Sequence, residues 1–422
     1  MRTIVHKVRD LSSVKSVCKY LRATSRRVGP YIWLNMGGVK VPTPIFFTLA
    51  AGLVLGMVYI HRFTVIPLAS HVISNVPGVS VDPAQTRQTA AMTMTSDMPS
   101  NRSRRQQLLL ITYGRSGSSF TSALIRAHPG VFYFFEPLYR IYLQHSAHEK
   151  SGFSVWGENR HEESQALMES FLQCDLHNAT DMDNVQNKNS NDTKDTYICL
   201  ASRSRGWKHL SCFMKMVETC QSRDMTFVKS IRFRVAWAEA LLEKYPDFKM
   251  LYLLRDPRAV LFSQSKVFKT FDWKNDVSSV SKKHCQALTE DIDHFRRLRE
   301  KYPTRVKAIR YEDGAMNPQR YAKEIYSFVG LEFSSEAQRL VGTLTSSNNA
   351  KKGREQYSVF RKEPELAMRK WRFSAGYKSV SVVDSKCSHL YPVLGYRNVT
   401  SQKDLESNVT VVLKPDSEKG IF

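Results

Sequence analysis

Residues 108–136 read LLLITYGRSGSSFTSALIRAHPGVFYFFE, and this stretch decides the fold of the chain. An apolar, strand-like run ends in a Gly/Ser-rich turn, and an amphipathic helical pattern follows directly. A strand, a tight turn and a helix in this order direct several backbone N–H groups and the positive end of a helix dipole to one point. The sequence therefore predicts an anion-binding loop at Gly114, Arg115, Ser116, Gly117, Ser118, Ser119 and Phe120.

A second stretch, KMLYLLRDPRAVLFS at residues 249–263, favours this interpretation over that of an ordinary solvated turn. Another buried-strand pattern ends at Arg255, and Pro257 favours a helix that begins there. Ser263 lies eight residues after Arg255, two turns along that helix. The nucleotide-binding pattern G-x-x-x-x-G-K-[ST] does not occur in the chain, so a Walker-type loop is disfavoured.

The body of the chain, residues 107–398, alternates strand-like and helix-like patterns. We expect strands at 107–113, 131–135, 225–229, 249–254 and 305–310, and helices at 118–127, 234–244, 257–267, 283–301 and 318–329. This alternation predicts an α/β fold with helices on both faces of a central parallel sheet. Because ligands bind at the carboxyl ends of such strands, Arg115, Glu136 and Arg255 are expected at one edge. The polar stretch 181–195 is expected to be a mobile loop.

The two motifs resemble those of a known enzyme family. TYGRSGSSF at 112–120 and YLLRDPRAVLFS at 252–263 are similar to the 5′-phosphosulfate loop and the 3′-phosphate motif of sulfotransferases that use 3′-phosphoadenosine 5′-phosphosulfate (PAPS). Four further stretches resemble the Golgi carbohydrate 6-O-sulfotransferases, which act on galactose, N-acetylgalactosamine or N-acetylglucosamine: VFYFFEPLY at 131–139, RYEDGAMNP at 310–318, KWRF at 370–373 and LGYR at 394–397. The resemblance covers roughly residues 107–398 and is weak between about 141 and 224.

The resemblance implies a P-loop-like three-layer sulfotransferase fold and the transfer of a sulfuryl group from PAPS to a sugar hydroxyl on glycosaminoglycan or glycoprotein glycans, without a metal. The loop at 114–120 would hold the 5′-phosphosulfate, and Arg255 with Ser263 would hold the 3′-phosphate. Many sulfotransferases carry lysine where this chain has Arg115, so we expect Arg115 to stabilise the leaving oxygen by its charge alone. Glu136 is the expected base for the acceptor hydroxyl. An ion pair with Arg140 or Arg115 is the alternative for Glu136.

Four further residues are weaker candidates for contact with donor or acceptor. Lys229 and Arg232 follow an expected strand, but they could equally begin a solvated helix. Trp371 and Arg372 could close over the adenosine or the acceptor, although Trp371 could also lie in the core. Two other functions stay open from the sequence: an inactive membrane-anchored glycan-binding protein of the same fold, and a luminal nucleotide-dependent kinase.

The N-terminal part predicts a single-pass type II membrane protein. Residues 41–60, VPTPIFFTLAAGLVLGMVYI, carry no charge and have the length that a transmembrane signal-anchor helix needs. Residues 1–40 hold nine Lys/Arg against one acid, which predicts a cytosolic tail and a luminal body. We expect a luminal stem at 61–106, the catalytic domain at 107–398 and a polar tail at 399–422. With the resemblance, this organisation predicts the Golgi membrane.

A luminal body would carry its own covalent modifications. Five N-glycosylation sequons follow the membrane segment, at Asn101, Asn178, Asn191, Asn398 and Asn408. Six of the seven cysteines are luminal as well, which suits disulfide bonds in an oxidising compartment. Six cysteines can pair in about 15 ways. We expect a bond between Cys285 and Cys387, and we expect the four cysteines between 174 and 220 to pair among themselves in an order that the sequence leaves open.

The net charge of +23 is still +15 without residues 1–40. A basic luminal body does not meet nucleic acid, and it fits an anionic donor and an anionic or neutral glycan acceptor. The spacing of Cys and His predicts no metal site. Stem and membrane segments of similar enzymes often support homodimers, so a homodimer is an expected form.

Overall fold

The computed structural model describes residues 33–36, 39–42, 105–146, 161–176, 185, 190–201, 207–269, 271–345, 364–407 and 420–422. They belong to two units, residues 1–98 and 99–422. In the first unit, β1 (Trp33–Met36) pairs antiparallel with β2 (Val39–Pro42). Of the expected membrane segment 41–60, only the last two residues of β2 are described, and the described helices include none with the length and apolarity of a membrane span.

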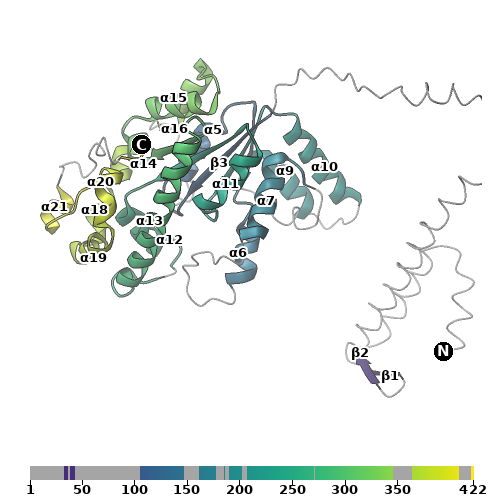
Figure 1. The fold of residues 1–422 in the computed structure, drawn as a ribbon, viewed down its shortest axis with the longest axis horizontal. Helices are drawn as coiled ribbons and strands as arrows, with labels where there is room; N and C mark the ends of the chain where they lie inside the picture. The colour runs from purple at the N-terminus through teal and green to yellow at the C-terminus, as the bar shows by residue number, and fades with distance from the viewer. Residues whose placement is uncertain are drawn as a thin grey trace, which may run out of the picture. The chain divides into compact units, whose positions relative to one another are not determined.

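The second unit is built on a five-stranded parallel sheet in the order β4-β5-β3-β6-β7 (Figure 1). Its strands are β3 (Gln106–Thr112), β4 (Val131–Phe135), β5 (Met225–Ser230), β6 (Phe248–Leu254) and β7 (Val306–Arg310). Leu109 of the central strand lies opposite Val228 on one side and Met250 on the other. All five expected strands are confirmed, each with ends within one residue of the prediction.

The helices of the second unit differ more from the expected boundaries. The described α-helices are α5 (Ser118–Ile125), α6 (Tyr139–Ser146), α7 (His161–Gln173), α9 (Asn191–Ala201), α10 (Trp207–Gln221), α11 (Ala238–Lys244), α12 (Pro257–Val267), α13 (Val277–Lys301), α14 (Tyr311–Met316), α15 (Pro318–Val329), α16 (Ser335–Thr345), α17 (Pro364–Arg369), α18 (Arg372–Ala375), α19 (Tyr377–Cys387), α20 (Tyr391–Leu394) and α21 (Gln402–Glu406). Helices α12 and α15 match the predictions, because each begins with an Asx residue followed by proline: Asp256 accepts from the N–H of Arg258, and Asn317 from that of Arg320. Helix α13 begins six residues earlier than expected, and 234–244 is a 3₁₀ turn followed by α11.

Alternating residues of the sheet enter two separate cores, which gives three layers. Leu108 and Leu110 of β3 pack with residues of α5, α15 and α16. Leu109 and Ile111 pack with residues of α7, α11, α13 and α19 on the opposite face. Side chains at successive positions of a strand point to opposite faces, so an uninterrupted apolar strand requires helices on both. The expected arrangement of helix, sheet and helix layers is confirmed.

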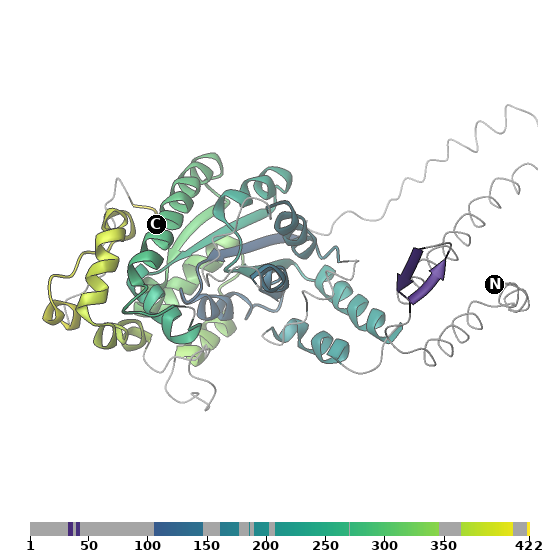
Figure 2. The same cartoon turned by 90° about the horizontal axis from the view of Figure 1, so that it is seen from below.

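The C-terminal helices α18–α21 lie beside α12 and α13, as Figures 1 and 2 show. A disulfide bond between Cys285 of α13 and Cys387 of α19 joins the two parts. The other disulfides are Cys174–Cys220 and Cys199–Cys212. The expected Cys285–Cys387 bond is therefore confirmed, and the four cysteines between 174 and 220 pair among themselves as expected.

The expectation of a loop over 181–195 is wrong at its C-terminal end, where helix α9 begins at Asn191. The hydroxyl of Ser190 donates to the carbonyl of Tyr133 (2.7 Å), and a carboxylate oxygen of Asp192 accepts from the N–H of Tyr133 (3.2 Å). Because β4 is an edge strand, its outer backbone groups have no neighbouring strand to bond. Ser190 and Asp192, whose polar side chains indicated a loop, form hydrogen bonds with this edge instead.

Candidate active site

The loop after β3 has a tightly turned backbone. Arg115 and Gly117 both have positive φ, 73° and 88°, and α5 begins with the N–H of Phe120 donating to the carbonyl of Gly117 (3.0 Å). A Cβ atom at Gly117 would lie 2.1 Å from Cδ2 of Tyr311, so only glycine fits this position. The turn therefore brings backbone N–H groups close to the start of α5, as an anion-binding loop requires.

The two sequence motifs meet at this loop. Nε of Arg115 donates to the hydroxyl of Ser263 (3.1 Å), and Nη1 of Arg255 donates to the carbonyl of Arg115 (2.9 Å). Gln264 adds a third bond, from its side-chain amide to the carbonyl of Gly114 (2.9 Å). These bonds join segments about 140 residues apart in the chain. The geometry thus brings together Arg115, Arg255 and Ser263, the residues that the sequence predicted as neighbours.

Arg255 lies against an aromatic ring, and the same ring leaves no space for a side chain at Gly117 of the loop. Its guanidinium carbon lies 4.5 Å from the ring centroid of Tyr311, the residue that Gly117 approaches. Among the described residues, none bonds the buried Nε of Arg255. A buried donor without a partner costs free energy, and an anion bound here would supply the missing acceptor.

Glu136 lies at the carboxyl end of β4, 3% exposed, with a φ of 52°. One carboxylate oxygen accepts from Nζ of Lys229 (2.7 Å) and from the N–H of Ile231 (3.0 Å). The other accepts from Nη1 of Arg232 (2.7 Å). Glu136 therefore forms ion pairs, as the alternative expected, and the pairs that the structure shows are with Lys229 and Arg232.

The two cations decide the ionisation of this carboxyl. Burial alone would raise the pKa of Glu136, but the charges of Lys229 and Arg232 and their hydrogen bonds hold the pKa below its ordinary value of 4.5. Burial lowers the pKa of Lys229, the charge of Glu136 opposes this, and the charge of Arg115 adds to the lowering. A Cβ atom at Gly114 would lie 3.3 Å from Cδ1 of Ile231, whose N–H bonds Glu136, so the loop and the Glu136 pair lie next to each other.

Lys229 and Arg232 are not the start of a solvated helix. Lys229 lies within β5, buried, with its ammonium 4.1 Å from the ring centroid of Phe135. The guanidinium of Arg232 lies 4.9 Å from the ring centroid of Tyr139 and 4.7 Å from that of Tyr142. Both cations are therefore fixed by ring contacts as well as by the carboxylate.

The comparisons with known proteins agree with this site. A model of the sulfotransferase family matches residues 108–335, more than half of the chain. The chain belongs to the sulfotransferase family. Among its relatives, carbohydrate sulfotransferase 1 of Danio rerio is 27% identical over 75% of this chain and 83% of that protein, and carbohydrate sulfotransferase 3 of Mus musculus is 25% identical over 84% and 81%. A solved structure of a mouse sulfotransferase complexed with PAP matches with 12% identity and a TM-score of 0.33, over 64% of this chain and 76% of that one.

Sulfotransferases use PAPS as their donor, and the residues of this site fit such a group. Gly117, with its positive φ, keeps the turn before α5 tight, and Arg255 has an unbonded donor within the described part of the chain. Arg115 follows β3 and Lys229 lies near the end of the neighbouring parallel strand β5, so both add positive charge at the same edge of the sheet. The donor set of backbone N–H groups, hydroxyls and guanidinium groups is the kind that binds phosphate and sulfate oxygens.

The remaining expected residues of this sulfotransferase lie elsewhere. Trp371 is 8% exposed and joins the core cluster of α13 and α19, as its core alternative predicted. Arg372 is also buried, and its Nη2 donates to the carbonyl of Asp404 (3.4 Å). Of the five sequons, Asn191 and Asn398 are exposed, and the other three lie outside the described residues.

Sequence reasoning missed two residues that shape the site, Tyr311 and Gln264. Tyr311 follows β7 in the RYEDGAMNP motif, but only the fold places its ring against Gly117. Gln264 adjoins the expected Ser263, and the helical spacing gave no reason to prefer an amide at that position. Both act through contacts with segments far away in the sequence, which local patterns do not reveal.

Proposed function

We propose that this sulfotransferase transfers a sulfuryl group from PAPS to a sugar hydroxyl of glycosaminoglycan or glycoprotein glycans, at C6 of galactose, N-acetylgalactosamine or N-acetylglucosamine. The observation that carries the proposal is the bond from Arg115 to Ser263, which joins the loop after β3 to the helix after β6. The strand next to β3, β5, carries Lys229, the partner of Glu136. The names of the relatives support a carbohydrate acceptor. The C6 position rests on the motifs at 131–139 and 310–318.

On the donor side, the loop 114–120 would hold the 5′ end, and Arg255 with Ser263 would hold the 3′-phosphate. When bound, PAPS supplies an activated sulfuryl group whose leaving oxygen gains negative charge during transfer. Arg115 and the N–H groups at the start of α5 lie fixed before any reaction, so they stabilise that charge without reorganising. An arginine stays protonated, and Arg115 therefore contributes charge and hydrogen bonds only.

On the acceptor side, Glu136 would take the proton of the sugar hydroxyl. Both oxygens of the carboxylate are held by donors: Lys229 bonds one, Arg232 bonds the other, and the N–H of Ile231 is shared between them (3.0 and 3.2 Å). Its lowered pKa makes Glu136 a weak base that is always ionised near neutral pH. A weak base suffices, because the hydroxyl proton becomes acidic only as the bond to sulfur forms. Contact of Trp371 and Arg372 with the adenosine or with the acceptor stays a prediction.

The test uses the full-length protein in detergent, labelled PAPS, and chondroitin, desulfated keratan and N-acetylglucosamine-terminated acceptors, with disaccharide analysis of the product. Arg115→Ala should lower kcat/KM by about 10²–10³-fold. Glu136→Gln should lower kcat by roughly 10²–10⁴-fold and keep the affinity for adenosine 3′,5′-bisphosphate.

The matched controls are Arg320→Ala and Glu324→Gln, which alter an exposed ion pair of α15 and should leave transfer unchanged. Unchanged transfer by Glu136→Gln would remove Glu136 from the mechanism. Failure of the wild-type protein to bind adenosine 3′,5′-bisphosphate would sink the proposal as a whole.

We also propose that residues 41–60 anchor the enzyme in the Golgi membrane with its body in the lumen, as a homodimer. The three disulfide bonds support an oxidising compartment, and the exposed Asn191 and Asn398 are accessible to glycosylation. Protease protection of the body in sealed vesicles, with cross-linking of the intact membranes, tests the topology and the dimer.

A further inference from the structure

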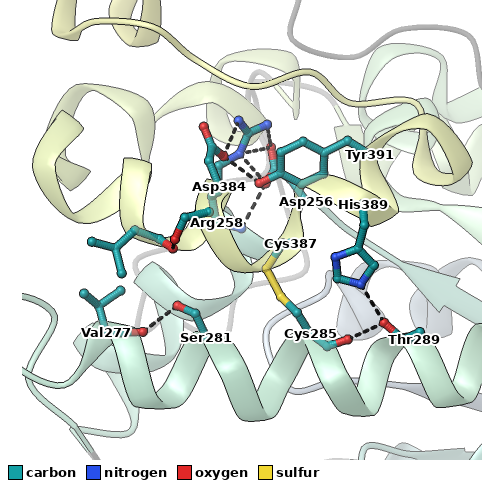
Figure 3. Close-up of a disulfide and its surroundings, with 12 residues drawn as sticks. Asp256, Arg258, Val277, Ser281, Cys285, Thr289, Asp384, Cys387, His389 and Tyr391 are labelled. Atoms are coloured by element: carbon teal, nitrogen blue, oxygen red, sulfur yellow. Dashed lines mark hydrogen bonds and ion pairs between the residues drawn. A yellow bond between two sulfur atoms is a disulfide. The ribbon is translucent and has the colours of Figure 1, made fainter.

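Arg258, three residues after Arg255, is completely buried and held from two sides (Figure 3). Its Nε and Nη2 donate to the carboxylate of Asp256 (2.9 and 2.8 Å). Its Nη1 donates to a carboxylate oxygen of Asp384 in α19 (3.1 Å) and to the carbonyl of Arg397 (2.9 Å). The guanidinium therefore connects the residue after Arg255 to the C-terminal segment, which we define as residues 371–404.

The C-terminal segment also holds the backbone of the same motif. The N–H of Asp256 donates to one carboxylate oxygen of Glu312 (3.1 Å), and the hydroxyl of Tyr396 donates to the other (2.9 Å). Both the side chain and the backbone of Asp256 are thus fixed by groups that the C-terminal segment fixes in turn. Because Asp256 follows Arg255 directly, these contacts fix the backbone from which the Arg255 side chain extends.

Stability alone gives little reason for this arrangement. Burial opposes the charge of Arg258, and the carboxylates of Asp256 and Asp384 compensate for it. A buried ion pair of this kind is often no more stabilising than apolar residues of the same volume, but it fixes geometry well. The Cys285–Cys387 bond holds α19 on α13, so Asp384 is presented from a firm support (Figure 3).

We propose that Arg258 and the C-terminal segment position Arg255 and thereby set the preference of the enzyme for a donor with a 3′-phosphate. The inference rests on the proposed function, in which Arg255 and Ser263 bind that phosphate. Arg258 acts as a positioning residue: its guanidinium contacts Asp256, Asp384 and the carbonyl of Arg397.

The test compares two ligands that differ only in the 3′-phosphate, adenosine 3′,5′-bisphosphate and adenosine 5′-monophosphate, by calorimetric titration of the full-length protein. Arg258→Lys keeps the charge but loses the planar fork that matches a carboxylate. Tyr396→Phe keeps the ring and removes the bond to Glu312. Each should lower the ratio of the two affinities by about tenfold, the size expected for one lost charge-assisted hydrogen bond, with the monophosphate affinity unchanged.

Arg305→Lys is the control, because Arg305 is half-buried and, like Arg258, bonds a backbone carbonyl, but precedes β7 at the opposite end of the sheet. A lower melting temperature with an unchanged affinity ratio in both variants would overturn the inference and leave Arg258 a structural residue. If Arg258→Lys does not fold, Tyr396→Phe decides. A wild-type protein without preference for the bisphosphate would contradict the proposed function itself.

Discussion

Glu136 combines a strained backbone with a highly ordered side chain. Its positive φ ends β4 sharply, and its carboxylate bonds Lys229 and Ile231 at the end of the neighbouring strand β5. Residues other than glycine adopt this backbone conformation mostly where the surrounding contacts enforce it, often at functional sites. The sequence could place Glu136 after a strand, but its partners lie 93 or more residues away and follow only from the order of the strands.

The acid limit of the reaction is predicted to depend on Lys229. Without that cation, burial is opposed only by Arg232 and by the hydrogen bond from the N–H of Ile231, so the pKa of Glu136 should rise towards or above its ordinary value. A carboxylate with a lowered pKa stays ionised down to lower pH. If its pKa is raised, the carboxylate is protonated, and stops acting as a base, at a higher pH. The acid limb of kcat/KM should therefore lie below about pH 4.5 in the wild type and shift upwards in Lys229→Met.

The pH–rate profile checks this, with Lys249→Met as the control. Lys249 is a partly buried lysine of β6 that bonds the carbonyl of Phe328, far from the carboxylate. An acid limb at the same pH in the wild type and in Lys229→Met would rule out Glu136 as the titrating base.

At the scale of elements, the sequence predicted those strands and helices whose ends are set by neighbouring residues in the chain. The five strands are apolar runs bounded by turn residues, and α12 and α15 start at Asp-Pro and Asn-Pro, so their limits could be predicted. Helix α9 could not, because its polar residues serve a strand that lies about 60 positions earlier in the chain. A polar composition indicates a loop only where no distant backbone needs those side chains.

The hydrogen bonds of Ser190 and Asp192 to the β4 edge are predicted to contribute measurably to the stability of the fold. Ser190→Ala removes one hydrogen bond to Tyr133 and should cost about 1 kcal/mol, and Asp192→Ala leaves the N–H of Tyr133 unbonded and should cost about 1–3 kcal/mol. Thermal unfolding measures both losses, with the exposed Lys194→Ala on the same helix as the control. Equal melting temperatures for all three variants would show that solvent satisfies this edge as well.

At the scale of the whole molecule, the site depends on residues from both ends of the catalytic unit. Arg115, Glu136, Arg255 and Ser263 could be predicted, because each follows a strand or keeps a fixed helical spacing from one that does. Asp384 could not, because it lies in a short helix whose partner, Arg258, is 126 positions away. Packing of the C-terminal helices against α12 and α13 decides that contact.

The disulfide bonds are predicted to differ in what they contribute to stability. Cys285 and Cys387 are 102 residues apart, whereas Cys199 and Cys212 are 13 apart. A cross-link restricts the unfolded chain more when the loop it closes is longer, so replacing the first pair by serine should cost about 2 kcal/mol more than replacing the second. Denaturant unfolding of the two double variants measures the difference, and equal losses would contradict the loop-length argument.

The hydrogen bond between Arg258 and the carbonyl of Arg397 joins residues 139 positions apart. During synthesis, therefore, Arg258 is made well before its partner. A ribosome adds roughly 5–20 residues per second, so the strands of a growing chain exist for on the order of ten seconds before the residues that hold Arg255 are made. A chain that is unfinished or truncated before these residues is therefore expected to form its sheet but to bind nucleotide weakly. Only complete copies of the enzyme would then draw on the cell's supply of activated sulfate.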